Sequence, residues 1–272
     1  MPESRAMVSV FDRSFLFGDG LFETILVRNC CPFRWEQHMV RLQSGADFLK
    51  IKLPFRPKQL RKFADGLLRQ NRTADALLRV TLSRGVGTRG YSPKDATQPT
   101  LVMTTHPAPP VDVHKPEKWK LAISSIRLPA GDTLARFKTN NRLAQVCSRA
   151  EAEAANADEA LLLDSDGHVI EGATSNLFWV KNGVVYTSPL TAAILPGITR
   201  ALVLEVCRNL AIKSVEKQIT LPQLKAADGV FLSLTSRIIV AAKSIGRQKL
   251  KQPPLIQSIY REGWRVIQAE TA

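Results

Sequence analysis

The chain has 272 residues, of which 44% are hydrophobic, so it can bury a sizeable core and is not expected to be disordered. Its 38 Lys and Arg residues outnumber its 24 Asp and Glu residues, which gives a net charge of +14. Because the basic residues are dispersed and aromatic residues make up only 7%, this charge favours a solvated basic surface or a small anionic substrate over nucleic acid.

The sequence contains no segment typical of entry into a membrane. No apolar run approaches the roughly 20 residues of a membrane span, and no secretory signal is visible in the charged N-terminal stretch. The four cysteines show neither a CxxC pair nor a histidine at metal-ligand spacing. We therefore expect a cytoplasmic protein with no membrane partner and no metal.

Residues 1–107 predict a smaller N-terminal α/β domain. A glycine turn at 17–20 precedes a strand that extends to residue 29. An amphipathic helix at 34–50 places His38 and Arg41 three residues apart, on neighbouring parts of one face. The other predicted elements are a helix at 57–70, strands at 76–85 and 99–107, and a glycine- and arginine-bearing loop at 86–92.

A proline-rich stretch separates this domain from a larger one. Four prolines lie between residues 106 and 116, so we predict an interdomain linker at 108–118 and a C-terminal domain at 119–272. The predicted strands of that domain are at 119–128, 159–164, 214–219 and 229–234, with a hairpin at 176–189 and helices at 141–156, 195–210, 221–226 and 254–268. This mixture of hairpins and helices predicts an α+β or mixed α/β fold.

Two residues of the second half suggest a cofactor. Lys138 stands in a polar connection before a helix, and Glu171 follows a strand 171 − 138 = 33 residues later. A lysine that forms an imine and an acid that pairs with a pyridine nitrogen are what pyridoxal phosphate requires of a protein. Taken singly, Lys138 is more typical of a surface lysine and Glu171 of a solvated acid. Their interpretation depends on the other motifs.

Six motifs follow one another along the chain: FGDGLFET, EQHMVRL, SRGVGTRGYS, FKTNNRL, EGATSNLF and LPGITR. Together they resemble the fold-type IV pyridoxal-phosphate enzymes, the class-IV aminotransferase family. That family holds branched-chain aminotransferases, D-amino-acid aminotransferases and 4-amino-4-deoxychorismate lyases. The resemblance implies a two-domain, D-amino-acid aminotransferase-like fold, pyridoxal 5′-phosphate as cofactor, and a homodimer in which the partner contributes a loop.

The resemblance also implies roles for residues of the cofactor site. Lys138 is similar to the Schiff-base lysine, and Glu171 to the partner of the pyridine nitrogen. Arg41 is similar to the phosphate-binding arginine, because a guanidinium suits a phosphate. The remaining phosphate ligands are Ile198 and Thr199, at a helix start with unpaired N–H groups, together with Thr235 or Ser236.

The first motif and the 86–92 loop distinguish between members of the family. Thr24 takes the place that a threonine implicated in proton transfer has in the lyases, which also carry the Arg89–Gly90–Tyr91–Ser92 sequence. Phe22 stands where D-amino-acid aminotransferases tend to have tyrosine. We therefore predict a lyase that converts aminodeoxychorismate to 4-aminobenzoate and pyruvate for folate synthesis, with Lys138 and Thr24 as catalytic residues. Phe22, Arg89 and Tyr91 are the predicted substrate-binding residues.

Two alternatives stay open at this point. The first is an aminotransferase acting on D-amino acids or, less favoured, on branched-chain amino acids, because both reactions use the same cofactor site. The second is a basic binding protein on a degenerate enzyme scaffold, in which the proposed lysine would carry no cofactor.

Overall fold

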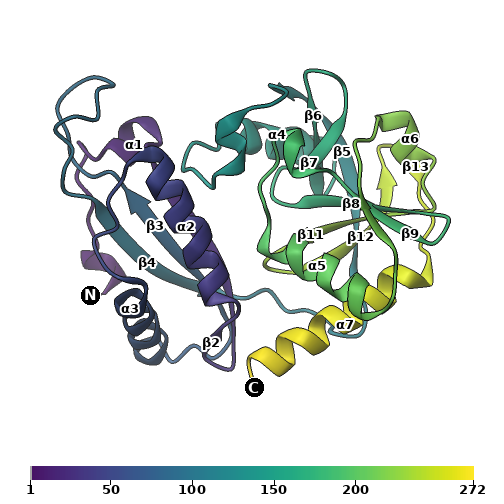
Figure 1. The fold of residues 1–272 in the computed structure, drawn as a ribbon, viewed down its shortest axis with the longest axis horizontal. Coiled ribbons are helices and arrows are strands. Elements are labelled where there is room, and N and C mark those ends of the chain that lie inside the picture. Colours follow the sequence, from purple (N-terminus) through teal and green to yellow (C-terminus); the bar gives the residue numbers. More distant parts are fainter. Residues whose placement is uncertain (1) are drawn as a thin grey trace. The chain divides into compact units, whose positions relative to one another are not determined.

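The chain folds into two compact units, each described here by itself from a computed structural model that describes residues 2–272. Unit 1 comprises the chain up to Pro107 together with Phe137–Arg142, and unit 2 comprises Ala108–Arg136 and Leu143–Ala272 (Figure 1). The prediction that the C-terminal domain carries Lys138 is therefore wrong, because this lysine lies in unit 1. The reason is a return excursion of the chain that local sequence patterns do not reveal.

Unit 1 is a four-stranded antiparallel sheet with two long helices on one face (Figure 1). The strand order is β2-β1-β3-β4. Its elements are η1 (Glu3–Arg5), α1 (Arg13–Phe17), β1 (Gly20–Arg28), β2 (Cys31–Pro32), α2 (Trp35–Leu49), α3 (Pro57–Gln70), β3 (Ala76–Ser83) and β4 (Thr100–Pro107).

Side-chain alternation along β1 and β3 separates the two faces of this sheet. Leu21 and Ile25 of β1, with Leu78 and Val80 of β3, are buried against α2 and α3 in one apolar core. Successive strand residues point to opposite faces, so Phe22 and Thr24 of β1 and Arg79 and Thr81 of β3 share the other face. We call these four residues the open face of unit 1. The register pairs Phe22 with Thr81 and Thr24 with Arg79.

The Phe137–Arg142 segment is joined to β1 through its backbone. The Phe22 N–H donates to the Lys138 carbonyl at 2.9 Å, and the Asn140 N–H donates to the Gly20 carbonyl at 2.9 Å. Gly20 permits this approach, because a Cβ there would lie 2.7 Å from Nδ2 of Asn140. Phe137 anchors the segment by stacking on Phe48 of α2, with ring centroids 4.3 Å apart.

Unit 2 is built on a nine-stranded sheet with strand order β10-β9-β8-β11-β12-β5-β6-β7, in which β13 also pairs with β12. An additional pairing of β7 with β8 closes six of these strands into a ring. Its strands are β5 (Glu117–Leu128), β6 (Glu159–Asp164), β7 (Val169–Gly172), β8 (Asn176–Lys181), β9 (Val184–Thr187), β10 (Ser214–Glu216), β11 (Gly229–Leu234), β12 (Ile238–Ile245) and β13 (Gln248–Lys249). Its helices are η2 (Thr133–Arg136), α4 (Leu143–Ala154), η3 (Leu190–Ala192), α5 (Ile198–Asn209), α6 (Leu221–Lys225) and α7 (Pro254–Glu270).

Apolar side chains fill the core of unit 2, and helices cover its strands. Leu121, Leu161, Leu177, Leu232 and Val240 come from five different strands of the ring and form one buried cluster. Helix α4 packs on β5 and β6, and α5 packs on α7 and β11 (Figure 1). The observed helices and strands, in two units, agree with the predicted α+β class.

The segment predicted as a linker is held against α7. The Tyr260 hydroxyl donates to the Asp112 carbonyl at 2.6 Å, and both Gln257 and Arg261 donate to the His114 carbonyl. Strand β5 begins at Glu117, within the predicted linker 108–118. Among residues 2–272, no helix is long and apolar enough to cross a membrane.

The stacking of Phe137 on Phe48 generates a test of how the Lys138 segment is held. An aromatic pair of this kind is worth about 0.5–1.5 kcal/mol, so Phe48→Ala is expected to raise local opening roughly 2- to 13-fold. Hydrogen exchange at the Phe22 and Asn140 amides measures that opening. The control is Phe63→Ala, because Phe63 is 48% exposed, similar to Phe48 at 45%, and pairs with Phe55 instead. Equal exchange in both variants would show that the stacking does not hold the segment.

Candidate functional site

The open face of unit 1 places two basic groups over one aromatic ring. The Arg79 guanidinium carbon lies 3.9 Å from the centroid of the Phe22 ring, and Nζ of Lys138 lies 4.5 Å from it. Thr24 is the next residue of β1 on this face and stands opposite Arg79. Burial lowers the pKa of Arg79, which is half-buried. The structure therefore brings three of the predicted residues, Phe22, Thr24 and Lys138, to one face of one unit.

Arg79 was not predicted from the sequence as a site residue. Its signal was present in the alternation of ALLRVTLS, where an arginine interrupts an otherwise apolar and hydroxyl-bearing strand. Arg79 can be recognised as a site residue only from the strand register, which places it beside Thr24 and Phe22.

The backbone around Lys138 is fixed on both sides. Nε of Arg142 donates to the Thr139 carbonyl at 3.1 Å, and its Nη2 donates to the Phe137 carbonyl at 2.7 Å. Together with the bond from the Phe22 N–H, these contacts occupy three consecutive carbonyls, those of residues 137–139. The position of the lysine is thus set by main-chain contacts, while its side chain extends over Phe22.

Arg41 belongs to a buried cluster on the helix-covered side of the sheet. Its Nε and Nη2 donate to the two carboxylate oxygens of Glu23 at 2.8 and 2.6 Å, and Nδ1 of His38 lies 2.7 Å from Glu23 Oε2. Burial opposes ionisation of Glu23, but Arg41 and His38 outweigh it and lower the pKa of Glu23 to about 2. Burial lowers the pKa of His38, and the positive charges of Arg41 and Lys138 lower it further. The carboxylate of Glu23 raises this pKa, but by less than burial and these charges lower it. At neutral pH the cluster therefore holds an anion, a cation and a neutral imidazole.

The loop with Arg89 and Tyr91 is tied to α1. The Arg13 guanidinium donates to the carbonyls of Gly90, Tyr91 and Ser92, and the Tyr91 ring packs on Phe17 with centroids 5.3 Å apart. Tyr91 is nevertheless 85% exposed. These contacts tie Arg89 and Tyr91 to α1 through the backbone of their loop and the ring of Tyr91.

In unit 2, Glu171 lies at the end of β7 and is buried, at 7% exposure. Its Oε2 accepts from Nδ2 of Asn176 at 3.3 Å and from the Leu195 N–H at 3.2 Å. Asn176 Nδ2 also donates to the Leu195 carbonyl, so the amide links the carboxylate to the chain that leads into α5. The carboxylate is therefore fixed in direction by two donors.

Ile198 and Thr199 form the first turn of α5, where a helix of 12 residues presents N–H groups that have no partner within the helix. Gly197 precedes them, and a Cβ at this position would lie only 2.0 Å from Oδ1 of Asn176. Glycine is required here by close packing, because Gly197 has an ordinary φ of −68°. The helix start is thus brought directly against the amide that fixes Glu171.

Thr235 and Ser236 lie in the tight turn between β11 and β12 and are half-buried. Strand pairing brings this turn close to the acid, because Ser233 stands opposite Asn176 and Asn176 stands opposite Glu171. Within residues 2–272, the buried Oγ of Ser233 has no hydrogen-bond partner. The predicted unit 2 residues thus come from neighbouring strand ends and one helix start.

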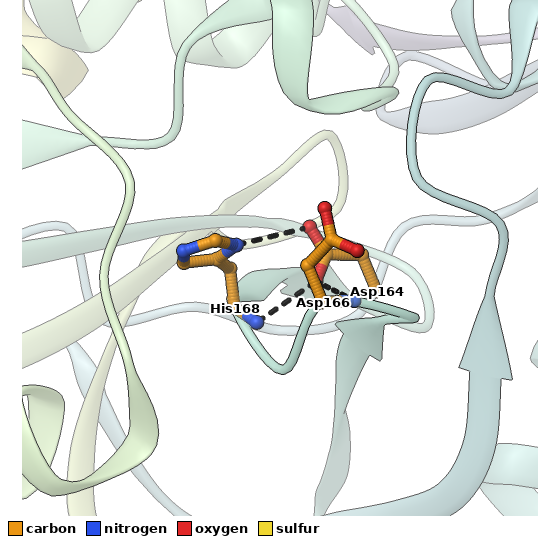
Figure 2. A group of neighbouring side chains, drawn as sticks. All are labelled: Asp164, Asp166 and His168. Atoms are coloured by element: carbon orange, nitrogen blue, oxygen red, sulfur yellow. Dashed lines mark hydrogen bonds and ion pairs between the residues drawn. The ribbon is translucent and has the colours of Figure 1, made fainter.

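A second polar cluster lies on the turn between β6 and β7. Figure 2 shows Asp164, Asp166 and His168, whose potential ligand atoms all lie within 4.8 Å of one another. Oδ1 of Asp164 accepts from the N–H groups of Asp166 and His168, at 3.1 and 2.8 Å. Its Oδ2 is 3.5 Å from Nδ1 of His168. The two backbone donors close the turn and satisfy Oδ1 of the buried aspartate.

Comparison with known proteins places these two units in a family. A sequence profile described as amino-transferase class IV matches residues 20–245, which is most of the chain. This chain belongs to the class IV aminotransferase family. The fold predicted from the motifs, that of fold-type IV enzymes, is thereby confirmed.

Relatives with three different names are similar to the chain. It is 37% identical over 240 residues to a Methanocaldococcus jannaschii protein provisionally named a branched-chain-amino-acid aminotransferase, covering 88% of this chain and 83% of that one. It is 32% identical to a D-alanine aminotransferase of Bacillus licheniformis, covering 100% and 96%. The solved 4-amino-4-deoxychorismate lyase of Pseudomonas aeruginosa is 29% identical, with a TM-score of 0.82, covering 97% of this chain and 94% of that one.

The family uses pyridoxal 5′-phosphate, so the predicted cofactor is confirmed. The residues of each unit suit the chemistry of this group. Unit 1 offers a lysine amine beside an aromatic ring, and unit 2 offers a buried carboxylate held by two donors. The start of α5 also suits this group, because its N–H groups can bind a phosphate, and a Cβ on Gly197 would leave no room there for Asn176. The buried hydroxyl of Ser233, which has no hydrogen-bond partner within residues 2–272, suits it as well.

The buried cluster predicts how stability depends on pH. The ordinary pKa values are 4.5 for Glu23 and 6.5 for His38, and both are lowered in the folded state. As pH falls, the unfolded chain therefore binds protons first, and stability decreases below pH 6.5 through His38 and between pH 4.5 and about 2 through Glu23.

Urea unfolding at about pH 7 and about pH 5.5 measures the histidine part of this loss, expected to be on the order of 1 kcal/mol. His38→Gln should reduce the difference between the two pH values, because its side chain does not titrate. His106→Gln is the control, since His106 is exposed on β4. If wild type and His38→Gln lose the same free energy of unfolding, His38 is not held neutral in the folded protein.

Proposed function

We propose that this chain is a pyridoxal-phosphate-dependent 4-amino-4-deoxychorismate lyase, which forms 4-aminobenzoate and pyruvate for folate synthesis. The observation that carries the proposal is the position of Thr24, which lies on the open face two residues after Phe22 in β1. Lys138 extends over the same Phe22 ring. A hydroxyl and an amine on one face are suited to moving protons at a substrate ring.

The substrate carries two carboxylates, one on its ring and one on its enolpyruvyl group. Arg79 lies on the open face beside Thr24, where its guanidinium can pair with a carboxylate. The net charge of +14 gives the whole chain a field that attracts such a substrate. These features support a small anionic ligand at this face.

The bound cofactor supplies an aldehyde that takes up the substrate amine and a ring that accepts electrons. In this proposal Lys138 holds the cofactor and afterwards carries protons, and Thr24 holds the proton exchanged at the substrate. Glu171 would accept a hydrogen bond from the pyridine nitrogen and keep that nitrogen protonated, because its carboxylate is fixed by Asn176 and Leu195. Arg41, the Ile198 and Thr199 amides, and Thr235 or Ser236 bind the phosphate.

An aminotransferase is the second candidate. It is favoured by the relatives named as aminotransferases, at 37% and 32% identity. The two reactions differ in what they need: transamination consumes a keto acid, and the lyase reaction does not. D-amino acids are the preferred substrates of this alternative, followed by branched-chain amino acids.

We also propose a homodimer, in which the loop with Arg89 and Tyr91 serves the site of the partner. Unit 1 exposes large apolar residues before and within α1 and at two positions of the 86–92 loop, and Arg13 joins α1 to this loop. They are Met7, Val8, Val10, Phe11, Phe15, Leu16, Phe17, Val86 and Tyr91. Exposed large apolar side chains are common at protein interfaces. The cytoplasmic location stays a prediction.

The deciding experiment incubates the holoenzyme with aminodeoxychorismate and no keto acid, and follows 4-aminobenzoate by fluorescence. The wild type should release both aminobenzoate and pyruvate. Thr24→Val is expected to lower kcat by roughly 10²-fold, whereas Thr24→Ser, which keeps the hydroxyl, should retain most activity. Absence of aminobenzoate, with steady transfer from D-alanine to 2-oxoglutarate, would establish the aminotransferase instead.

A further inference from the structure

The sequence left His38 without a role, and the structure places it in the buried cluster with Glu23 and Arg41. We propose that Glu23 and His38 are positioning residues that orient the Arg41 guanidinium and so set the affinity of the enzyme for the phosphate of its cofactor. This inference rests on the phosphate-binding role proposed for Arg41.

Glu23 lies in the apolar core of unit 1. It occupies a position of β1 that faces the helices, between the apolar residues Leu21 and Ile25, and its side chain is 1% exposed. Burying an ion pair contributes little to stability, and well-packed apolar residues often serve as well or better. A carboxylate in this core is therefore better explained by what it orients than by the stability it adds.

The contact between Glu23 and Arg41 fixes the plane of the guanidinium. Nε meets Oε1 at 2.8 Å and Nη2 meets Oε2 at 2.6 Å, which is a two-point contact. A long arginine side chain otherwise loses substantial rotamer freedom when it binds an anion. Because Glu23 already restricts these rotamers, less freedom is lost when a phosphate binds.

His38 restrains the carboxylate in turn. Its Nδ1 lies 2.7 Å from Glu23 Oε2, the oxygen that also accepts from Nη2 of Arg41. His38 and Arg41 are three residues apart on α2, so both reach β1 from one helix face. The charged groups that face the ring are Glu23 from β1, Arg41 from α2 and Lys138 from the 137–142 segment. A neutral imidazole can thus hold the carboxylate without adding a charge to this set.

The test compares two probes that differ only in the phosphate, pyridoxal 5′-phosphate and pyridoxal, in binding to the apoenzyme by equilibrium dialysis. His38→Leu removes the hydrogen-bond donor and should raise Kd for pyridoxal 5′-phosphate roughly 3- to 10-fold. Kd for pyridoxal should stay within about twofold, because pyridoxal has no phosphate to meet Arg41. His38→Gln keeps a neutral donor and should recover part of the loss.

Arg41→Met is the reference variant and should show the larger loss of preference for the phosphate. The double variant with His38→Leu should then bind pyridoxal 5′-phosphate no more weakly than Arg41→Met alone, because His38 acts through Arg41.

The contrary outcomes can be told apart. If Arg41→Met reduces the preference for phosphate and His38→Leu does not, the positioning role is wrong and the role of Arg41 stands. If His38→Leu weakens both probes equally, its effect is structural, and the inference is also wrong. If Arg41→Met leaves the preference unchanged, the proposed phosphate role of Arg41 fails as well.

Discussion

The backbone pairing between β1 and the 137–142 segment is the constraint on which the open face depends. Two hydrogen bonds, from Phe22 to Lys138 and from Asn140 to Gly20, attach this segment to unit 1, although the chain before and after it belongs to unit 2. The lysine is therefore placed by the same strand that carries Phe22 and Thr24. A change in the position of β1 would move the amine, the aromatic ring and the hydroxyl together.

Charge is arranged differently on the two sides of that strand. On the helix-covered side, Glu23 is neutralised by Arg41 and restrained by His38, and burial makes each contact stronger than it would be in water. On the open side, Arg79 and Lys138 lie over an aromatic ring, a setting in which cations are stabilised by the ring. One strand thus carries a buried, charge-balanced cluster on one side and a basic face on the other.

Local sequence patterns predicted the helices and strands well, but they did not predict which of these elements contact one another. The apolar spacing at 34–50 and 57–70 predicted α2 and α3, and the glycine turn with the following apolar residues predicted β1. The assignment of Lys138 to the second domain was wrong, because the pairing that moves it to unit 1 joins residues more than a hundred positions apart. Glu23 and Arg79 were missed for the same reason. A glutamate and an arginine in neighbouring strands gain roles only from register and from the helix that covers one face.

Lys138 is the residue proposed to carry the cofactor. This role is tested most directly by adding pyridoxal 5′-phosphate, reducing the lysine-bound cofactor with borohydride, and locating the modified peptide by mass spectrometry. We expect one stable pyridoxyl adduct, on Lys138, that is lost in Lys138→Ala. An adduct on a different lysine, or an unchanged adduct in Lys138→Ala, would contradict it.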